Sequence, residues 1–577
     1  MTLVLVMEWV DTAQAVFAAL LLLLVTGVID TSEAFQGFSN HGMLAVGFLY
    51  VVASAIHSTG LINAIGDRMM GGNGRSDRVR LLRVLPSVAG ASAFMNNTPI
   101  VAVLIPIIKN FCRRMNLSPS KYLLPVSYAA ILGGTCTLIG TSTNLVVHGF
   151  LLEKGHSGFN FFDFAWIGIP LTFIGIGVAV LYVQKVLPEF KDSMVQLGDN
   201  TREFVVALKI GPDYPHIGST VEEAGLRHLQ GLFLFQIERN GIVIAPVQPD
   251  RTIREGDRLF FTGIPETIVE LQKQTGLKVI SDLDFDIKNY DSNRIKPYEI
   301  VLSESSPLVG QKVRESDFRR QYEAVILAIH RNGKRIKEKI GDIVLEAGDT
   351  LLILADQEFH KRWYHSPDFL LVSSSEETPS RSTWQSTAIF SILIIMIGTV
   401  VTGLLDMVTA AAAATLILLG AGLILGQHAL KSVDWRVLVV IASSFGIAAG
   451  LENAGIADLA GTALATIAEP AGLWGAIALI MLVTMIYSEM ITNNSAAVLI
   501  FPVMISVVSA TGYELIPMAM AVAIGASAAF STPISYQTNL MVYGPGRYRF
   551  TDYLKAGIPM DVIILLSGST LIYVFFG

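Results

Sequence analysis

The sequence has little of what a soluble or disulfide-stapled protein needs. Only two cysteines, Cys112 and Cys136, occur in 577 residues, which excludes a disulfide framework and a cysteine-rich metal site. Charged residues make up only 15% of the chain and hydrophobic residues 52%, a balance too apolar for a soluble enzyme of this length. No phosphate-binding GxxxxGK[ST] segment occurs, so we do not expect a nucleotide-driven pump. The composition predicts an integral membrane protein.

The few charges are distributed unevenly along the chain. Residues 189–383 hold 56 of the 89 Asp, Glu, Lys and Arg residues. The net charge of −7 provides no basic surface for a nucleic acid partner. The distribution indicates a polar insert between two membrane-embedded halves, 1–188 and 384–577.

Both halves contain apolar stretches of about 20 residues, the length that crosses a lipid bilayer. These stretches fall near 12–29, 42–66, 122–150, 163–187, 387–405, 409–426, 436–461, 517–543 and 556–576. Two further apolar stretches, 84–108 and 475–508, carry an Asn pair near the middle. These two require a different interpretation.

The basic residues of the loops indicate which side each loop occupies, because Lys and Arg collect in cytoplasmic loops. Basic loops flank 84–108 on both sides, whereas the loops that flank 475–508 contain no Lys or Arg. Each stretch therefore enters and leaves on one side, as a re-entrant hairpin, the first from the cytoplasm and the second from outside. The same rule places the insert in the cytoplasm of a multi-pass protein of the plasma (inner) membrane.

The two halves resemble each other in sequence. The tip Asn96-Asn97-Thr98 of the first hairpin matches Asn493-Asn494-Ser495 of the second, and Thr143-Asn144-Leu145 matches Thr538-Asn539-Leu540. In this alignment Glu489 lies opposite Ser92. Matching segments of opposite topology are typical of secondary transporters built from inverted repeats. The expected fold class is an all-α polytopic membrane protein with two re-entrant hairpins.

After each hairpin comes a helix interrupted by small and polar residues, at 133–144 and at 531–539. Interrupted helices present amide groups to an anion, while freed carbonyls and Asn or Ser oxygens suit Na⁺. Neither the hairpins nor the interruptions contain Lys or Arg. An anion would therefore be held by helix dipoles, hydroxyls and neighbouring Na⁺ ions. The alternative is that Asn, Thr and Gly only permit close helix packing.

These motifs resemble the divalent anion/sodium symporter (DASS) family of the ion-transporter superfamily, over both membrane halves. The resemblance implies two Na⁺ sites, one from Ser92, Asn96, Asn97 and Gly140, the other from Asn493, Asn494 and the turn that begins at Ser531. It implies substrate contacts from Thr98, Thr141, Ser495, Thr532 and Pro533. It also implies an elevator movement of the hairpin-bearing domain and a homodimer.

The second interruption, Thr532 to Asn539, reads TPISYQTN and is most similar to sulfate-transporting members. Asn replaces the family's first Ser at each hairpin tip, which weakens the case for a dicarboxylate. Glu489 lies one turn before the second Asn pair and is a candidate coupling acid, since intramembrane carboxylates are commonly functional. An equally weighted alternative is that Glu489 only stabilises free amides of the hairpin.

The insert contains a repeat of its own. Arg239-Asn240-Gly241 and Arg331-Asn332-Gly333 are hairpin turns 92 residues apart, and Gly256-Asp257 and Gly348-Asp349 follow at the same offset. Alternating strands and turns predict two small α+β domains, at 189–285 and 286–383. The pattern resembles the RCK-C (TrkA-C) domains of potassium-conductance regulators, which implies a dimerisation module or a sensor of a cytosolic ligand such as a cyclic dinucleotide.

The sequence thus predicts a Na⁺-coupled symporter for sulfate or a related divalent anion, with no cofactor besides Na⁺. The alternatives are a Na⁺- or H⁺-coupled dicarboxylate or metalloid carrier. An RCK-regulated channel is disfavoured because no TVGYG-like filter occurs. An enzyme is not expected, because no nucleophile, base or metal-ligand cluster is evident.

Overall fold

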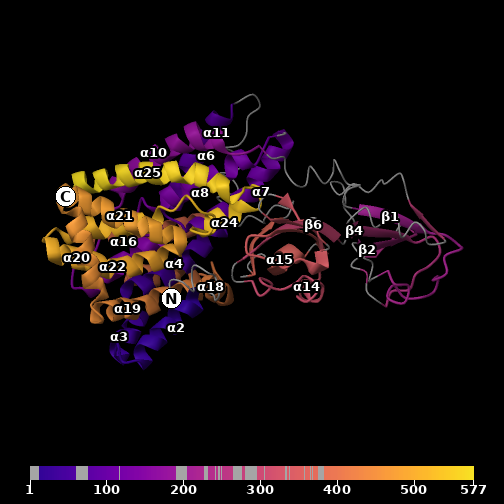
Figure 1. Cartoon of the computed structure of the whole chain (residues 1–577), viewed down its shortest axis with the longest axis horizontal. Coiled ribbons are helices and arrows are strands. Elements are labelled where there is room, and N and C mark those ends of the chain that lie inside the picture. The colour runs from indigo at the N-terminus through magenta and orange to yellow at the C-terminus, as the bar shows by residue number, and fades with distance from the viewer. Residues whose placement is uncertain are drawn as a thin grey trace.

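A computed structural model describes residues 12–59, 76–189 except 116, and 383–577 of the membrane halves. Of the insert it describes 205–226, 232–263, 276–279 and 295–373, with gaps at 241, 245–246, 248–249, 304–305, 332–333, 337, 339, 357, 364–365 and 367. A helical body and two small sheets make up the described chain (Figure 1).

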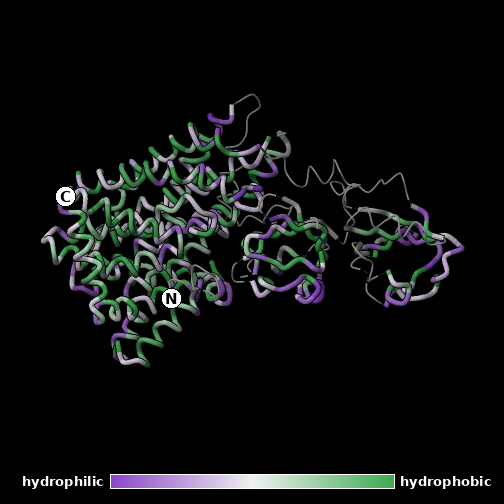
Figure 2. The backbone as a smooth tube through the Cα atoms, in the orientation of Figure 1, coloured by the Kyte–Doolittle hydropathy of each residue, from purple (hydrophilic) through white to green (hydrophobic). Residues whose placement is uncertain are grey.

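The first membrane half consists of helices that follow the apolar stretches. These are α2 (Thr12–Val25), α3 (Thr31–Phe35), α4 (His41–His57), α6 (Asp77–Ser92), α7 (Asn97–Met115), α8 (Ser120–Gly134), α9 (Ser142–Glu153), α10 (Ala165–Val178) and α11 (Gln184–Val186). The helical body is predominantly hydrophobic along its length, whereas the insert alternates between polar and apolar segments (Figure 2). This contrast agrees with the predicted membrane halves and polar insert.

The second half repeats this arrangement. Its helices are α16 (Thr383–Val401), α17 (Met407–Gly420), α18 (Gly426–Ser432), α19 (Trp435–Asn453), α20 (Ile456–Ala468), α21 (Gly472–Met490), α22 (Asn493–Thr511), α23 (Leu515–Ser527), α24 (Gln537–Tyr543) and α25 (Phe550–Phe576). Seven described helical segments are long and apolar enough to cross a membrane. The expected span 436–461 is wrong at its end, because α19 ends at Asn453 and Gly455, with φ of +70°, separates it from α20, which begins at Ile456 within the expected span.

Both predicted interruptions are present. The chain leaves helical geometry between α8 and α9 and again between α23 and α24. Gly140 permits the first, because a Cβ there would lie 2.4 Å from the carbonyl oxygen of Gly134. In each interruption an Asn side chain satisfies the freed carbonyls. Asn144 donates to Thr137 O at 2.9 Å, and Asn539 donates to Thr532 O at 3.3 Å.

The internal repeat also appears in hydrogen bonds. Ser92 at the end of α6 donates to Ala130 O at 2.8 Å, and Ser488 in α21 donates to Ala526 O at 2.7 Å. These bonds correct the alignment of the tips, since Ser488, and not Glu489, occupies the place of Ser92. Glu489 therefore has no acidic or hydroxyl counterpart in the first half, where Ala93 follows Ser92.

The insert contains two sheets of identical topology. The first has the order β3-β2-β4-β1-β5 and the second β8-β7-β9-β6-β10, with all neighbouring strands antiparallel. The strands are β1 (Val205–Ile210), β2 (Leu232–Arg239), β3 (Ile242–Ile244), β4 (Arg258–Gly263), β5 (Leu277–Val279), β6 (Ile295–Leu302), β7 (Val325–Arg331), β8 (Lys334–Arg335), β9 (Thr350–Asp356) and β10 (Phe369–Ser373). The second sheet is accompanied by α14 (Phe318–Tyr322) and α15 (Phe359–Trp363). We call these sheets with their connections unit 1 and unit 2; the exact domain boundaries remain predictions.

Both units contain an equivalent Arg–Asp ion pair. Arg239 contacts both carboxylate oxygens of Asp257 at 2.8 Å, and Arg331 contacts those of Asp349 at 2.7 Å. Hydrogen bonding to Asp349 raises the pKa of Arg331 further above its ordinary value. The Arg and the Asp that recur after 92 residues thus form the same structural ion pair in both units. Residues 332–333 of the second turn lie outside the described chain.

Candidate functional site

Four helices begin where the two hairpin tips meet the two interruptions. These are α7 and α22, which follow the tips, and α9 and α24, which follow the interruptions. The bonds described below join their first residues, so the four helix starts converge. Helix starts carry free amides and a partial positive charge, which favours a bound anion.

The first tip is held by its own serine. Ser92 donates a short hydrogen bond to Asn97 Oδ1, and Asn97 Nδ2 donates to the Tyr536 hydroxyl at 2.7 Å. Asn97 is therefore buried with both ends of its amide bonded. Next to it, the Thr98 hydroxyl donates to Gln537 Oε1 at 3.0 Å. The first tip is thereby joined to the second interruption.

The second tip makes the reciprocal connection. Asn494 Oδ1 accepts a hydrogen bond from Ser142, the first residue of α9, at 2.9 Å. Each tip thus contacts the interruption of the opposite repeat. We call these two tips and two interruptions, joined by Asn97, Tyr536, Ser142 and Asn494, the crossed centre. Because its contacts run between repeats, neither repeat forms the site alone.

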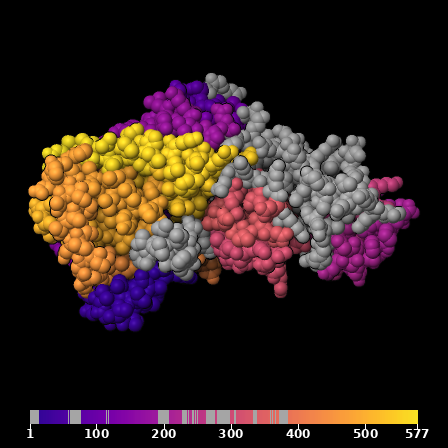
Figure 3. Space-filling model, viewed as in Figure 1, coloured from indigo at the N-terminus to yellow at the C-terminus, as the bar shows by residue number. Residues whose placement is uncertain are grey.

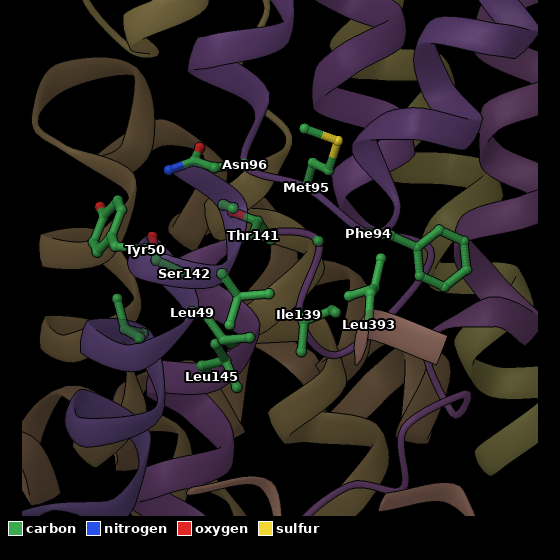
Figure 4. A pocket seen from close by; sticks show the side chains of 14 residues that line it. Leu49, Tyr50, Phe94, Met95, Asn96, Ile139, Thr141, Ser142, Leu145 and Leu393 are labelled. Carbon is green, nitrogen blue, oxygen red and sulfur yellow. The ribbon is translucent and has the colours of Figure 1, made fainter. Parts of the chain in front are cut away.

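A small cavity lies at the first tip. Its volume is about 50 Å³, and its lining includes Asn96, Gly140, Thr141, Ser142 and Tyr50 of α4. Figure 4 shows Tyr50, Asn96 and Ser142 on one side of this cavity and apolar side chains on the other. A water needs roughly 10–15 Å³ measured this way, so the cavity has room for a small ion with a partial hydration shell. None of its lining residues is basic.

Two acids meet beneath the second interruption. Glu489 Oε1 accepts a hydrogen bond from the Ser531 amide at 2.7 Å, and the Ser531 hydroxyl donates a short bond to Asp561 Oδ2. The two carboxyl groups thus share Ser531 as a hydrogen-bond donor. Their remaining oxygens, Glu489 Oε2 and Asp561 Oδ1, are buried with no hydrogen-bond partner. Because an ionised carboxylate only accepts hydrogen bonds, this pair needs a proton or a cation between its members.

The structure brings most predicted residues together, but in two groups. Ser92, Asn96, Asn97, Thr98, Gly140, Thr141, Asn493 and Asn494 belong to the crossed centre. Ser531 and Thr532 instead lie with Glu489, where the Thr532 hydroxyl donates to Glu489 O at 3.2 Å. Ser495 is occupied in the cap of α22, with its hydroxyl 2.8 Å from that of Thr492, while Pro533 is buried within the interruption. Their binding roles remain predictions.

Sequence reasoning missed three residues of these groups. Tyr536 lies within the quoted TPISYQTN segment, yet received no role. Asp561 is an acid in an apolar helix two residues after Pro559, a signal that was available. Tyr50 carries no such signal, because an apolar helix often contains a tyrosine. Only the packing of α4 brings it into the cavity lining together with Asn96.

Comparison with known proteins identifies relatives along the whole chain. Residues 2–525 match the family model CitMHS, described as "Citrate transporter". The chain is 36% identical to a "Putative sulfur deprivation response regulator" of Chlamydomonas reinhardtii, covering 96% of this chain and 97% of that protein. It is 25% identical to "Sodium/sulfate cotransporter 1" of the same alga, covering 98% and 88%.

Among solved structures, the YdaH transporter of Alcanivorax borkumensis is similar at 14% identity with a TM-score of 0.42, over 95% of this chain and 88% of that one. That score is too low to transfer a fold. The family match, by contrast, covers the first membrane half, the insert and the second half as far as residue 525. The chain therefore belongs to the citrate transporter family of membrane transporters.

Proposed function

We propose that this protein is a secondary active transporter that couples entry of Na⁺ to entry of sulfate or a related divalent anion. The observation that carries the proposal is the crossed centre, where four helix starts and the amides of Asn97 and Asn494 converge. The printed name of the sodium/sulfate relative supports the choice of ion and anion. In this proposal the protein is not an enzyme and needs no cofactor besides Na⁺.

The anion contacts in this proposal come from helix starts and hydroxyls. Thr98 and Thr141 lie at the starts of α7 and α9 and supply hydroxyl donors. Ser495, Thr532 and Pro533 would complete the substrate contacts from the second half. Helix dipoles and nearby cations can hold a dianion without a basic side chain, because both act strongly where water is excluded.

The Na⁺ ligands would be oxygens already gathered at the tips. Ser92, Asn96, Asn97 and Gly140 form one set, and Asn493, Asn494 and Ser531 the other. Since Ser531 lies with Glu489 and Asp561, the second ion would lie closer to these acids than the first. Both hairpins are re-entrant in this proposal, the hairpin-bearing domain moves as an elevator, and the protein works as a homodimer in the plasma membrane.

The two insert units belong to the proposal as cytoplasmic RCK-C domains that regulate transport, with a cyclic dinucleotide as the candidate ligand. Their duplicated topology supports two equivalent modules. Binding of [³²P]cyclic di-AMP to the purified protein tests this part. Saturable binding supports it, whereas no binding leaves the units as a dimerisation module.

The transport proposal is tested by uptake of radiolabelled sulfate into proteoliposomes, with and without an inward Na⁺ gradient. We expect Na⁺-dependent uptake that is lost in Asn97→Ala and in Asn494→Ala. Asn160→Ala, which changes an exposed asparagine, is the matched control and should retain uptake. Absence of sulfate uptake under any gradient would overturn the substrate assignment, and succinate, citrate and arsenite would then be tested as the alternative dicarboxylate and metalloid substrates.

A second candidate coupling ion is the proton. The half-buried Glu489–Asp561 pair favours it, because its two buried oxygens have no hydrogen-bond partner and its net charge becomes more negative when a proton leaves. Uptake that follows an inward proton gradient in the absence of Na⁺ would support this candidate. Uptake that requires Na⁺ and ignores the proton gradient would exclude it.

A further inference from the structure

One face of the sheet in unit 2 is packed against the helical body. Lys109 of α7 and Glu299 of β6 form an ion pair whose side chains are only 5% and 7% exposed. A charge pair this buried is not a chance surface contact. Burial removes the hydration of both side chains, and only the partner charge compensates for that loss. Figure 1 shows unit 2 beside the ends of α7 and α24.

Apolar and close backbone contacts extend the same interface. Val301 of β6 is fully buried and belongs to the hydrophobic core of the membrane helices. Gly544, just after α24, lies so close to β9 that a Cβ there would be 1.8 Å from Thr350 Oγ1. In the space-filling view the second unit lies directly against the helical body (Figure 3).

Unit 1 lacks this surface at the equivalent positions, 92 residues earlier. Lys209, Arg258 and Ala207 stand where unit 2 has Val301, Thr350 and Glu299. Lys209 is exposed, and Arg258 makes a half-exposed ion pair with Glu238 at 3.1 Å. The same sheet face thus carries exposed and half-exposed basic side chains in unit 1, whereas in unit 2 it packs against the helical body. The duplication alone would have made the two faces alike.

The docked helices are the ones that start at the crossed centre. The helix α7 starts at Asn97 and reaches unit 2 at Lys109, while α24 starts at Gln537 and reaches it at its end. The two helices come from opposite repeats, and their first turns are joined by the bonds of Asn97 to Tyr536 and of Thr98 to Gln537. Unit 2 therefore bridges the far ends of the two helices whose starts form the site.

We infer that unit 2 is a positioning element of the transport site, acting through Glu299 and Val301 on α7 and α24, whereas unit 1 is not. This inference rests on the proposed transport function for its kinetic readout, but the docking itself is measurable without a substrate. Loss of docking lets α7 and α24 shift relative to each other, which weakens substrate binding more than it slows turnover.

Docking is tested first by a disulfide. The ideal Cβ of Gly544 lies 3.2 Å from the Cβ of Thr350, a few tenths of an ångström less than the roughly 3.5–4.5 Å that a disulfide spans, so a small shift of the loop after α24 allows the bond. We expect Thr350→Cys/Gly544→Cys to cross-link in the purified full-length protein under mild oxidation, while either single variant does not. Val301→Lys, which installs the residue of unit 1, should reduce the yield at least fivefold. Absence of cross-linking in the double variant would overturn the docking.

Positioning is tested by exchanging the buried charges. Lys109→Glu and Glu299→Lys each place like charges together, and we expect the KM for the transported anion to rise about tenfold with Vmax changed less than threefold. The exchange Lys109→Glu/Glu299→Lys restores the pair and should return KM to within threefold of the original. Lys209→Val in unit 1 is the control and should change neither value. An unchanged KM in the single variants would overturn the positioning role.

A labelling experiment separates this inference from the transport proposal. Ser142→Cys places a thiol in the cavity, and its rate of reaction with a small maleimide reports the geometry there without any substrate. We expect the rate to change at least threefold when Glu299→Lys is added and to return in the charge exchange. If no anion is transported but the labelling rates behave in this way, the transport proposal fails and the positioning role stands; unchanged rates overturn the positioning role.

Discussion

Asn97 and Tyr536 lie 439 residues apart, and the amide of the first donates to the hydroxyl of the second at 2.7 Å. Asn97 comes from the first hairpin tip and Tyr536 from the second interruption, so this bond crosses the two repeats. The Tyr536 hydroxyl also lies 3.2 Å from the Thr141 hydroxyl, in the first interruption. One buried hydroxyl thus connects the first tip with both interruptions.

Tyr536→Phe removes this hydroxyl while keeping the ring. We expect the buried Asn97 amide to lose its acceptor, at a cost of about 1–3 kcal/mol. If that cost falls on the substrate-bound state, initial uptake falls about 5- to 150-fold. Tyr573→Phe, in an exposed part of α25, should retain uptake. Full uptake by Tyr536→Phe would show that the hydroxyl is not needed in the transport cycle.

Glu489→Gln and Asp561→Asn each remove one carboxyl group of the acid pair, and with it any proton that the pair carries. If that proton is coupled to transport, either variant should abolish uptake driven by a proton gradient while leaving downhill exchange of the anion. The measurement is uptake and counterflow in the same proteoliposomes. Glu469→Gln, an exposed acid of the same half, is the control. Retention of proton-driven uptake would assign the pair a structural role in bonding Ser531.

Gly140→Ala should disrupt the first interruption. Its Cβ would lie 2.4 Å from the Gly134 carbonyl oxygen, and backbone cannot move aside as a side chain can. Overpacking of this kind costs about 1–3 kcal/mol, so the melting temperature of the detergent-solubilised protein should fall. Gly90→Ala, with open space around it in α6, should leave the melting temperature within a degree or two. Equal melting temperatures for the two variants would contradict the observed packing.

Arg331→Leu should selectively loosen unit 2. Its partner Asp349 is 1% exposed, and a buried charge that loses its partner destabilises by about 3–5 kcal/mol. Hydrogen exchange of β7 and β9 in the full-length protein should accelerate, with little change in unit 1. Arg314→Leu breaks a half-exposed pair with Asp342 and is expected to have an effect of about 0–1 kcal/mol. Similar hydrogen-exchange rates of β7 and β9 in the two variants would mean that the Arg331–Asp349 pair does not stabilise unit 2.

Local chemistry made much of this architecture predictable. Apolar runs of bilayer length predict helices, and the clusters of Gly, Thr, Ser and Pro around Gly140 and Pro533 weaken helical geometry, so spans and interruptions could be located from sequence. The duplicated Arg–Gly-Asp spacing likewise predicted two similar units. The helix boundary near Gly455 could not be predicted from the sequence, because a single glycine does not reveal whether its backbone is left-handed.

The membrane helices, the two interruptions, the duplicated insert and the polar residues at the tips could all be predicted, since each depends on composition or spacing within a short segment. Three relationships became evident only from the packing of distant segments: each tip bonds to the opposite repeat, Ser488 replaces Glu489 as the counterpart of Ser92, and Glu489 lies beside Asp561. The tertiary structure alone also placed Val301 against the membrane helices while leaving Lys209 exposed. These relationships join residues far apart in the chain, and no local pattern specifies which distant surfaces pack together.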